Sequence, residues 1–322
     1  MSTLKEEATA LEFDTEALRC WGIKWRVGTK QKEKSKVEPR TIAQLRAEGV
    51  AISSDIESEI EENKYPCAFN KKQGMDFGID FDRAVGASLA DMLGDIPVVD
   101  HAKLSAAKKV AAAAKKAATP STSATVAAKS SKTTKKEEIE WTTNELLPPH
   151  HNCIEVGPAR VIGGVRPQNF DVAYRPDGPR IVYDSKSLND AESIPKNWQN
   201  MVNDLGTEAT TIHTRFPYCI VAFIVAIPKP AIRDQQMFDM VRTLERLATR
   251  RDTDHPSHLA EAIALVFWDP DTGEVDSSHL DAKSNLHIST FMETIHARYV
   301  ERYKGLPPHD KSTRPDESET TN

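Results

Sequence analysis

Cysteine is scarce in this sequence, with four residues among 322. None lies in a C-x-x-C pair and no spacing suggests a zinc site; the four are Cys20, Cys67, Cys153 and Cys219. This usage predicts reduced thiols in a cytoplasmic protein. Long apolar runs are also missing, because the longest, residues 218–227, is too short to cross a bilayer and predicts a buried strand. The polar, acidic residues 1–15 do not resemble a signal peptide, so we expect no membrane partner.

Acidic residues are absent from residues 101–136, where nine lysines stand in a chain whose net charge is −6. Alanine, lysine, serine and threonine dominate there, and aromatic residues are missing. Such a segment cannot bury enough apolar area to offset its ordering entropy. We therefore expect a disordered basic linker over residues 101–138, whose lysines contact phosphates without reading sequence. A solvated spacer with no binding role is the alternative.

The remaining pattern predicts an α/β fold. We expect an N-terminal α+β region over residues 1–100, a core over residues 139–306 and a disordered tail over residues 307–322. In the core, periodicity and turn signals predict strands over 169–175, 180–185, 218–227 and 261–268, and helices over 195–214, 235–250 and 287–303. In the N-terminal region they predict helices over 41–48 and 80–93 and, from the alternation of Trp21, Ile23, Trp25 and Val27, a short strand.

The most informative segment is residues 169–187, which read NFDVAYR-PDGP-RIVYDSKS. Asp-Gly between apolar runs is a strong signal for a β-hairpin. If the two prolines of the turn face each other, Asp171 lies opposite Asp184, with Cβ atoms about 5 Å apart. Lys186 follows two residues later on the same face. Facing carboxylates repel, which a shared proton or a divalent cation relieves. A longer turn would shift the register by one residue and separate the two carboxylates.

At these residues the chain resembles the PD-(D/E)xK nuclease superfamily, which includes the type II restriction endonucleases. The family pattern is an acidic residue, a hairpin and then D/E-x-K on the second strand, here Asp171 followed by Asp184-Ser185-Lys186. The resemblance implies a restriction-endonuclease-like core, with a mixed central sheet flanked by helices. It further implies that Asp171, Asp184 and the backbone carbonyl of Ser185 bind Mg²⁺, and that Lys186 is the catalytic lysine. Phosphodiester hydrolysis needs polarised phosphate oxygens and an activated water, which Mg²⁺ and a neighbouring ammonium supply.

Two details of the family pattern leave alternatives here. The literal proline–aspartate pair would be Pro176-Asp177, but Asp177 falls in the predicted turn and is better explained as a turn former. Members of the family often carry a further acidic residue upstream on a helix. Glu155 is the first candidate for that catalytic position and Asp82 is the rival, and either is alternatively an ordinary exposed carboxylate.

Further polar residues near the motif would suit contacts with DNA phosphates. They are the helix-start residues Asn197, Gln199 and Asn200 and the arginines Arg160, Arg166, Arg175 and Arg180. Each is equally compatible with a helix start or a surface charge.

These features predict a magnesium-dependent, site-specific endodeoxyribonuclease that hydrolyses phosphodiester bonds in double-stranded DNA. A homodimer is expected, because a two-fold axis matches a palindromic target, and residues 1–100 would serve recognition or dimerisation. One alternative is a DNA repair or recombination nuclease that cuts by structure. The other is a non-catalytic DNA-binding protein in which the hairpin is only structural.

Overall fold

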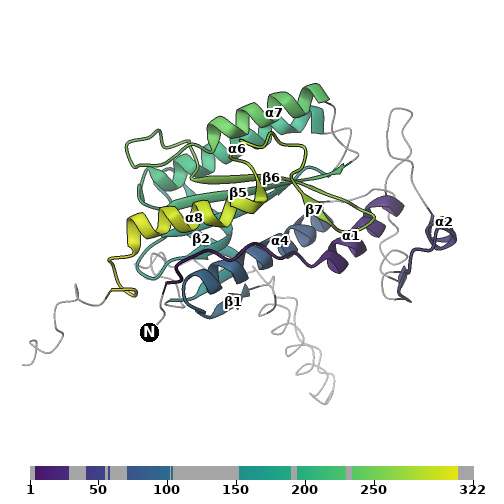
Figure 1. Cartoon of the computed structure of the whole chain (residues 1–322), viewed down its shortest axis with the longest axis horizontal. Helices are drawn as coiled ribbons and strands as arrows, with labels where there is room; N and C mark the ends of the chain where they lie inside the picture. Colours follow the sequence, from purple (N-terminus) through teal and green to yellow (C-terminus); the bar gives the residue numbers. More distant parts are fainter. Residues whose placement is uncertain are drawn as a thin grey trace, which may run out of the picture.

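The structure, a computed structural model, describes residues 4–28, 41–54, 57–58, 71–101, 103, 152–189, 194–229 and 234–310. It confirms an α/β fold with a mixed sheet flanked by helices (Figure 1). The predicted basic linker, apart from His101 and Lys103, lies outside the described residues, as do residues 311–322 of the predicted tail.

Seven strands form one sheet, and their order in space follows their order in the chain. The strands are β1 (Val98–Asp100), β2 (Ile154–Ile162), β3 (Pro167–Tyr174), β4 (Ile181–Ser187), β5 (Ile220–Pro228), β6 (Ala262–Trp268) and β7 (Val275–Asp276). Strands β2, β3 and β4 pair antiparallel, whereas β4, β5 and β6 run parallel. The short strand β1 is parallel to β2, and β7 is antiparallel to β6. The polarity therefore changes at β4, which carries Asp184 and Lys186.

Helices cover both faces of the sheet (Figure 1). The helices are α1 (Thr15–Gly28), α2 (Ile42–Ala47), α4 (Lys71–Met92), α6 (Ile194–His213), α7 (Asp234–Leu247) and α8 (Ile288–Tyr303). Helices α6 and α7 pack on one face, and α1, α4 and α8 pack on the other. Because side chains alternate along a strand, Ile181 and Tyr183 join the α4 and α8 core, whereas Val182 joins the α6 and α7 core.

Most of the described N-terminal region packs on the sheet, and a small separate cluster is formed by buried Ile23 and Leu45 with Ile42, Val50 and Ile52. Phe77, Phe81, Val85 and Leu89 recur at helical spacing on α4 and are buried in the same core as the strands. Strand β1 extends the sheet itself. The predicted helix over 41–48 is confirmed by α2, whose N-cap Thr41 forms a capping box with Gln44.

The strand predicted around Trp21–Val27 is wrong, because these residues belong to helix α1. Asp14 accepts a hydrogen bond from the backbone N–H of Ala17 at the helix start, and Leu18 is buried in the main core. A four-residue alternation is too short to outweigh these helix-forming interactions. Helix α4 also begins earlier than predicted, so Asp80 lies inside the helix, and its carboxylate accepts a hydrogen bond from the indole N–H of Trp21.

Candidate active site

The predicted register of the β3–β4 hairpin is confirmed. Ala173 pairs with Val182, and the flanking pairs are Val172 with Tyr183 and Tyr174 with Ile181. The pairing stops at Val172. Beyond it β3 continues along β2, whereas β4 continues along β5 to Ser187. The two strands therefore separate where Asp171 and Asp184 stand, and we call this opening, with Asp171, Asp184, Ser185 and Lys186, the fork.

The Asp171 carboxylate occupies the place of the missing ladder partner. The backbone N–H of Ser185 donates to Asp171 Oδ2 at 2.9 Å, and the Ser185 hydroxyl donates to the same oxygen at 3.0 Å. The N–H group that the separating strand leaves unpaired is thus satisfied by a side chain. In an extended strand the N–H and C=O of one residue point to the same side, so the Ser185 carbonyl also faces the fork.

Lys186 lies between two carboxylates from different elements. Its ammonium contacts Asp184 Oδ2 on its own strand, and it donates to Glu208 Oε1 on α6 at 3.0 Å. Gln168 at the start of β3 donates to the same Glu208 oxygen at 3.2 Å. Asp184 is 7% exposed and Glu208 is 5% exposed, so both carboxyls are largely withdrawn from water. Lys186 and Asp171 remain half-buried, which keeps one side of the fork accessible.

A further carboxyl reaches the fork from the opposite face of the sheet. Asp82 on α4 is 4% exposed, and its charge interacts with that of Asp171. Its Oδ1 has no hydrogen-bond partner among the described residues. Gly78, one turn earlier, allows this approach, because a Cβ there would lie 3.0 Å from the Ser185 hydroxyl oxygen.

Negative charge is in excess at the fork. Burial, and then the neighbouring Asp171, raise the pKa of Asp184 well above its ordinary value, although Lys186 acts in the opposite direction. Burial and Asp171 likewise raise the pKa of Asp82. Burial alone would lower the pKa of Lys186, but the carboxylates of Asp184 and Glu208 outweigh it, and the pKa of Lys186 is raised. One ammonium therefore faces several carboxyls that a proton or a cation must balance.

The structure places Glu155 away from this group. Glu155 stands on β2, not on a helix, and lies opposite Ala173. Its buried carboxylate accepts two hydrogen bonds from Arg175, at 2.6 and 2.8 Å, and His101 lies 3.3 Å from it. The carboxylate is thus held in an ion pair with Arg175. Of the two upstream candidates, Asp82 is the one that contributes to the electrostatics of the fork.

The flanking polar residues divide into two groups. Arg175 is buried against Glu155, and Arg180 is buried against Asp177 and the Pro307 carbonyl, so neither side chain is exposed for the predicted phosphate contact. Asp177 lies in the turn and pairs with Arg180, in keeping with its interpretation as a turn residue. The side chain of Arg166 is exposed, as are Asn197, Gln199 and Asn200 on the first turns of α6.

Glu208 was not identified from the sequence, although a signal was present. Leu205, Ala209 and Ile212 are buried on the inner face of α6, and Glu208 falls on that apolar face. A carboxylate in such a position needs a partner. That partner, Lys186, lies 22 residues earlier on another element.

Comparison with protein-family models, curated proteins and solved structures found no match. Within the described ranges, no helix is both long and apolar enough to cross a membrane.

The magnesium ion implied by the sequence motif can be tested against the residues of the fork. No three Asp, Glu, His or Cys side chains among the described residues are arranged to hold one ion. The fork instead supplies two carboxylates, Asp171 and Asp184, and the Ser185 carbonyl. Mg²⁺ is commonly held by one or two carboxylates and completes its shell with water and phosphate oxygens. The excess of negative charge and the unpaired Oδ1 of Asp82 also suit a cation. The residues therefore fit Mg²⁺.

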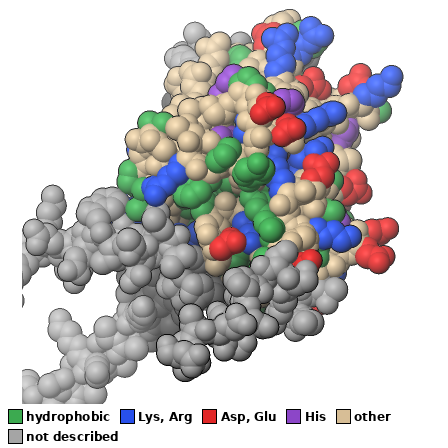
Figure 2. Space-filling view, turned by 90° about the vertical axis from the view of Figure 1, so that its left-hand side faces the viewer, with side chains coloured by type: hydrophobic (Ala, Val, Ile, Leu, Met, Phe, Trp, Pro, Cys, Tyr) green, Lys and Arg blue, Asp and Glu red, His purple; other side chains and the backbone are tan. Residues whose placement is uncertain are grey.

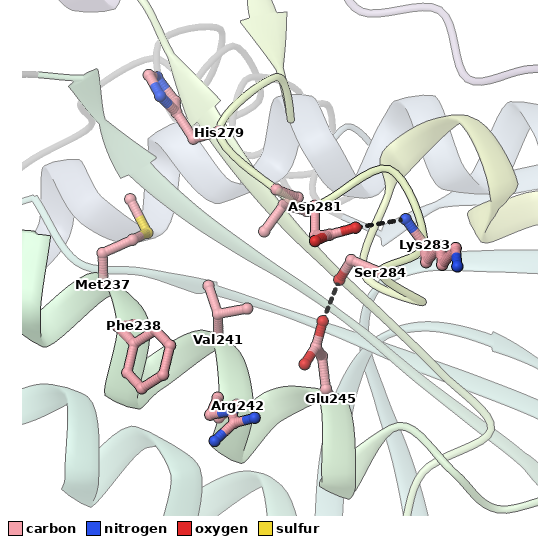
Figure 3. Close-up of a pocket in the computed structure, with 10 residues that line it drawn as sticks. Met237, Phe238, Val241, Arg242, Glu245, His279, Asp281, Lys283 and Ser284 are labelled. Atoms are coloured by element: carbon pink, nitrogen blue, oxygen red, sulfur yellow. Dashed lines mark hydrogen bonds between the residues drawn. The ribbon is translucent and has the colours of Figure 1, made fainter.

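A pocket of about 650 Å³ lies elsewhere, between α7 and residues 279–284 (Figure 3). Met237, Phe238 and Val241 line it from α7. Ser284 on the opposite wall donates to Glu245 Oε1 at 2.6 Å, which ties the loop to the helix. No residue of the fork lines this pocket, so the two features are separate.

Proposed function

We propose that this chain is a magnesium-dependent, site-specific endodeoxyribonuclease that hydrolyses phosphodiester bonds in double-stranded DNA, in the manner of a type II restriction enzyme. The observation that carries the proposal is the fork, where Asp171 and Asp184 meet under a shared excess of negative charge with Lys186 alongside. A purely structural hairpin gains nothing from facing buried carboxylates, because like charges opposite each other destabilise a sheet.

The residues of the fork would have different roles in the hydrolysis. Asp171, Asp184 and the Ser185 carbonyl would hold Mg²⁺, and Asp82 adds negative charge from the other face of the sheet. When bound, the ion polarises the scissile phosphate and makes a water molecule more acidic. Lys186 donates hydrogen bonds to the attacking water or to a phosphate oxygen, and its positive charge opposes the negative charge that develops on phosphorus oxygens. In this proposal Asp82, and not Glu155, is the upstream acidic residue.

Contact with DNA would come from residues around the accessible side of the fork. Arg166 and the amides of Asn197, Gln199 and Asn200 are exposed and suit phosphate oxygens. Cutting both strands of a duplex at a symmetric target requires two such sites, so we propose that the protein acts as a homodimer in the cytoplasm.

The test is digestion of several unrelated DNA molecules by the purified full-length chain. We expect discrete fragments with Mg²⁺ and intact DNA with a chelator. Asp184→Asn should lower the rate at least about 10²-fold, because it removes one of two carboxylates beside the reacting phosphate. Asp204→Asn, the same substitution at an exposed position of α6, should cut like the wild type. Equal activity of the Asp184→Asn variant would disprove the nuclease site, and unspecific degradation would disprove site-specific cutting.

A further inference from the structure

Glu208 is a buried carboxylate with an incomplete set of partners. Its Oε1 accepts hydrogen bonds from Lys186 and Gln168, at 3.0 and 3.2 Å. Its Oε2 is buried without a hydrogen-bond partner among the described residues. A carboxylate on the apolar face of a helix is costly to bury, and one unpaired oxygen adds to that cost. The position is therefore poorly explained by stability alone.

Lys186 is the group that connects Glu208 to the fork. In the structure its ammonium is shared between Asp184 and Glu208. If the Asp184 carboxylate coordinates a cation, the Lys186 ammonium loses one of these two partners. It then lies close to a second positive charge. Glu208 lies on α6 and not on β4, so it can keep its contact with Lys186 in that state. Gln168 fixes the Glu208 carboxylate from the start of β3.

We propose that Glu208 is a positioning residue that holds Lys186 beside the fork while Asp171 and Asp184 bind the cation. This inference rests on the proposed nuclease function. It assigns Glu208 no direct contact with the cation or with DNA. Its effect on cleavage passes through Lys186, because misplacing a reacting group by about 1 Å can cost about 10²-fold in rate.

The first experiment compares Glu208→Gln with Asp204→Asn, an acid-to-amide change on the exposed side of the same helix. We expect Glu208→Gln to lower kcat by between about 10-fold and the misplacement cost of about 10²-fold given above, and to leave KM for DNA within about 2-fold. Calorimetric titration with Mg²⁺ alone should show the affinity lowered by less than about 10-fold, because one nearby negative charge is removed and no ligand is lost. A larger loss of Mg²⁺ affinity would overturn the inference, because Glu208 would then act as a ligand, and an unchanged kcat would overturn it as well.

The second experiment tests whether Glu208 acts through Lys186. Competitive labelling of amines, read by mass spectrometry, should show Lys186 several-fold more reactive in Glu208→Gln than in the wild type or in Asp204→Asn. In a Lys186→Met background, Glu208→Gln should cause no further loss of residual cleavage. Unchanged labelling, or an equal further loss, contradicts the inference while leaving the nuclease function intact. A wild-type protein that does not cleave DNA in Mg²⁺ contradicts both.

Discussion

Two groups of buried charged side chains lie at opposite ends of the parallel strands. The fork stands toward the carboxyl end of β4, whereas Glu261 stands at the amino end of β6, next to the start of β5. Glu261 lies 2.9 Å from Arg302, 3.2 Å from Arg250 and 3.2 Å from His213, and it accepts the backbone N–H of Val221. Oε1 of this carboxylate faces two guanidinium groups, and Oε2 faces His213 and the Val221 amide, whereas Asp82 Oδ1 at the fork has no hydrogen-bond partner among the described residues.

The net pKa shifts of the buried carboxyls at the two ends have opposite signs. Burial alone would raise the pKa of Glu261, but His213, Arg302 and the Val221 amide outweigh it, and the pKa is lowered. At the fork, burial and Asp171 raise the pKa of Asp184. Figure 2 views the side of the molecule where α8 ends, close to the Glu261 cluster, and acidic and basic side chains are interspersed there. The Glu261 carboxylate has partners on both oxygens, so we call this the balanced end, and such pairing favours a structural role. At the fork the carboxyls outnumber the single ammonium, so we call it the unbalanced end, and this excess favours binding of a cation.

The largest expected effect on stability comes from removing the charge of Glu261 at the balanced end. Glu261→Gln leaves Arg250 and Arg302 without their common counter-charge. We expect a loss of about 3–5 kcal/mol in the free energy of unfolding, since one partner of a buried ion pair is removed. Urea denaturation measures this loss. Glu293→Gln, an exposed position on α8, should change stability by less than about 0.5 kcal/mol. Equal stability of the two variants would remove the contrast between the two ends.

A smaller effect on stability is expected when Mg²⁺ binds at the fork, the unbalanced end. Mg²⁺ at a hundred times its Kd should stabilise the wild type by about 2.7 kcal/mol, because the ion binds only the folded state. Asp184→Asn should lose this gain, whereas Asp204→Asn should keep it. Thermal unfolding with and without Mg²⁺ measures the difference. A gain of the same size in Asp184→Asn would show that the ion binds away from the fork.

The smallest effect is a difference in pH dependence. The pKa of Asp184 is raised, so its contribution to stability is present below about pH 3.8, its ordinary value, and is lost as pH rises through the raised pKa. The pKa of Glu261 is lowered, so its contribution is present above about pH 4.5 and is lost as pH falls through the lowered pKa. Melting temperatures in a pH series should therefore show Asp184→Asn gaining on the wild type as pH rises. The deficit of Glu261→Gln should shrink in acid. Parallel curves for all three proteins would contradict this assignment.

Local signals were enough to predict the hairpin and its register. The Asp-Gly turn and the alternation around it lie within twenty residues, and they predict, without knowledge of the rest of the chain, the register in which Ala173 pairs with Val182. Helices α6, α7 and α8 and strands β5 and β6 were predicted for the same reason, since each carries its own periodicity, whereas the two-residue strand β7 was not predicted. Strand β2 was missed because a bulge between Val156 and Ala159, with Gly157 at a φ of 102°, interrupts its pattern.

The sequence left Asp82 and Glu155 as alternatives and did not identify Glu208, because the partners of the motif come from distant elements. Asp82 reaches the fork only because α4 packs across the sheet, and Glu208 reaches it only because α6 packs on the other face. Arg175 and Arg180, expected near phosphates, are buried in ion pairs that tertiary packing selects. A sequence motif thus specified the centre of the site, and its surroundings depended on how the helices cross the sheet.

The hydrogen bonds to Asp171 Oδ2 offer a way to detect a cation bound at the fork. Asp171 Oδ2 already accepts hydrogen bonds from the backbone N–H and the hydroxyl of Ser185. A cation coordinated by this oxygen would therefore weaken these hydrogen bonds. The amide proton of Ser185 would then exchange faster with solvent, and its exchange rate would show whether a cation occupies the fork.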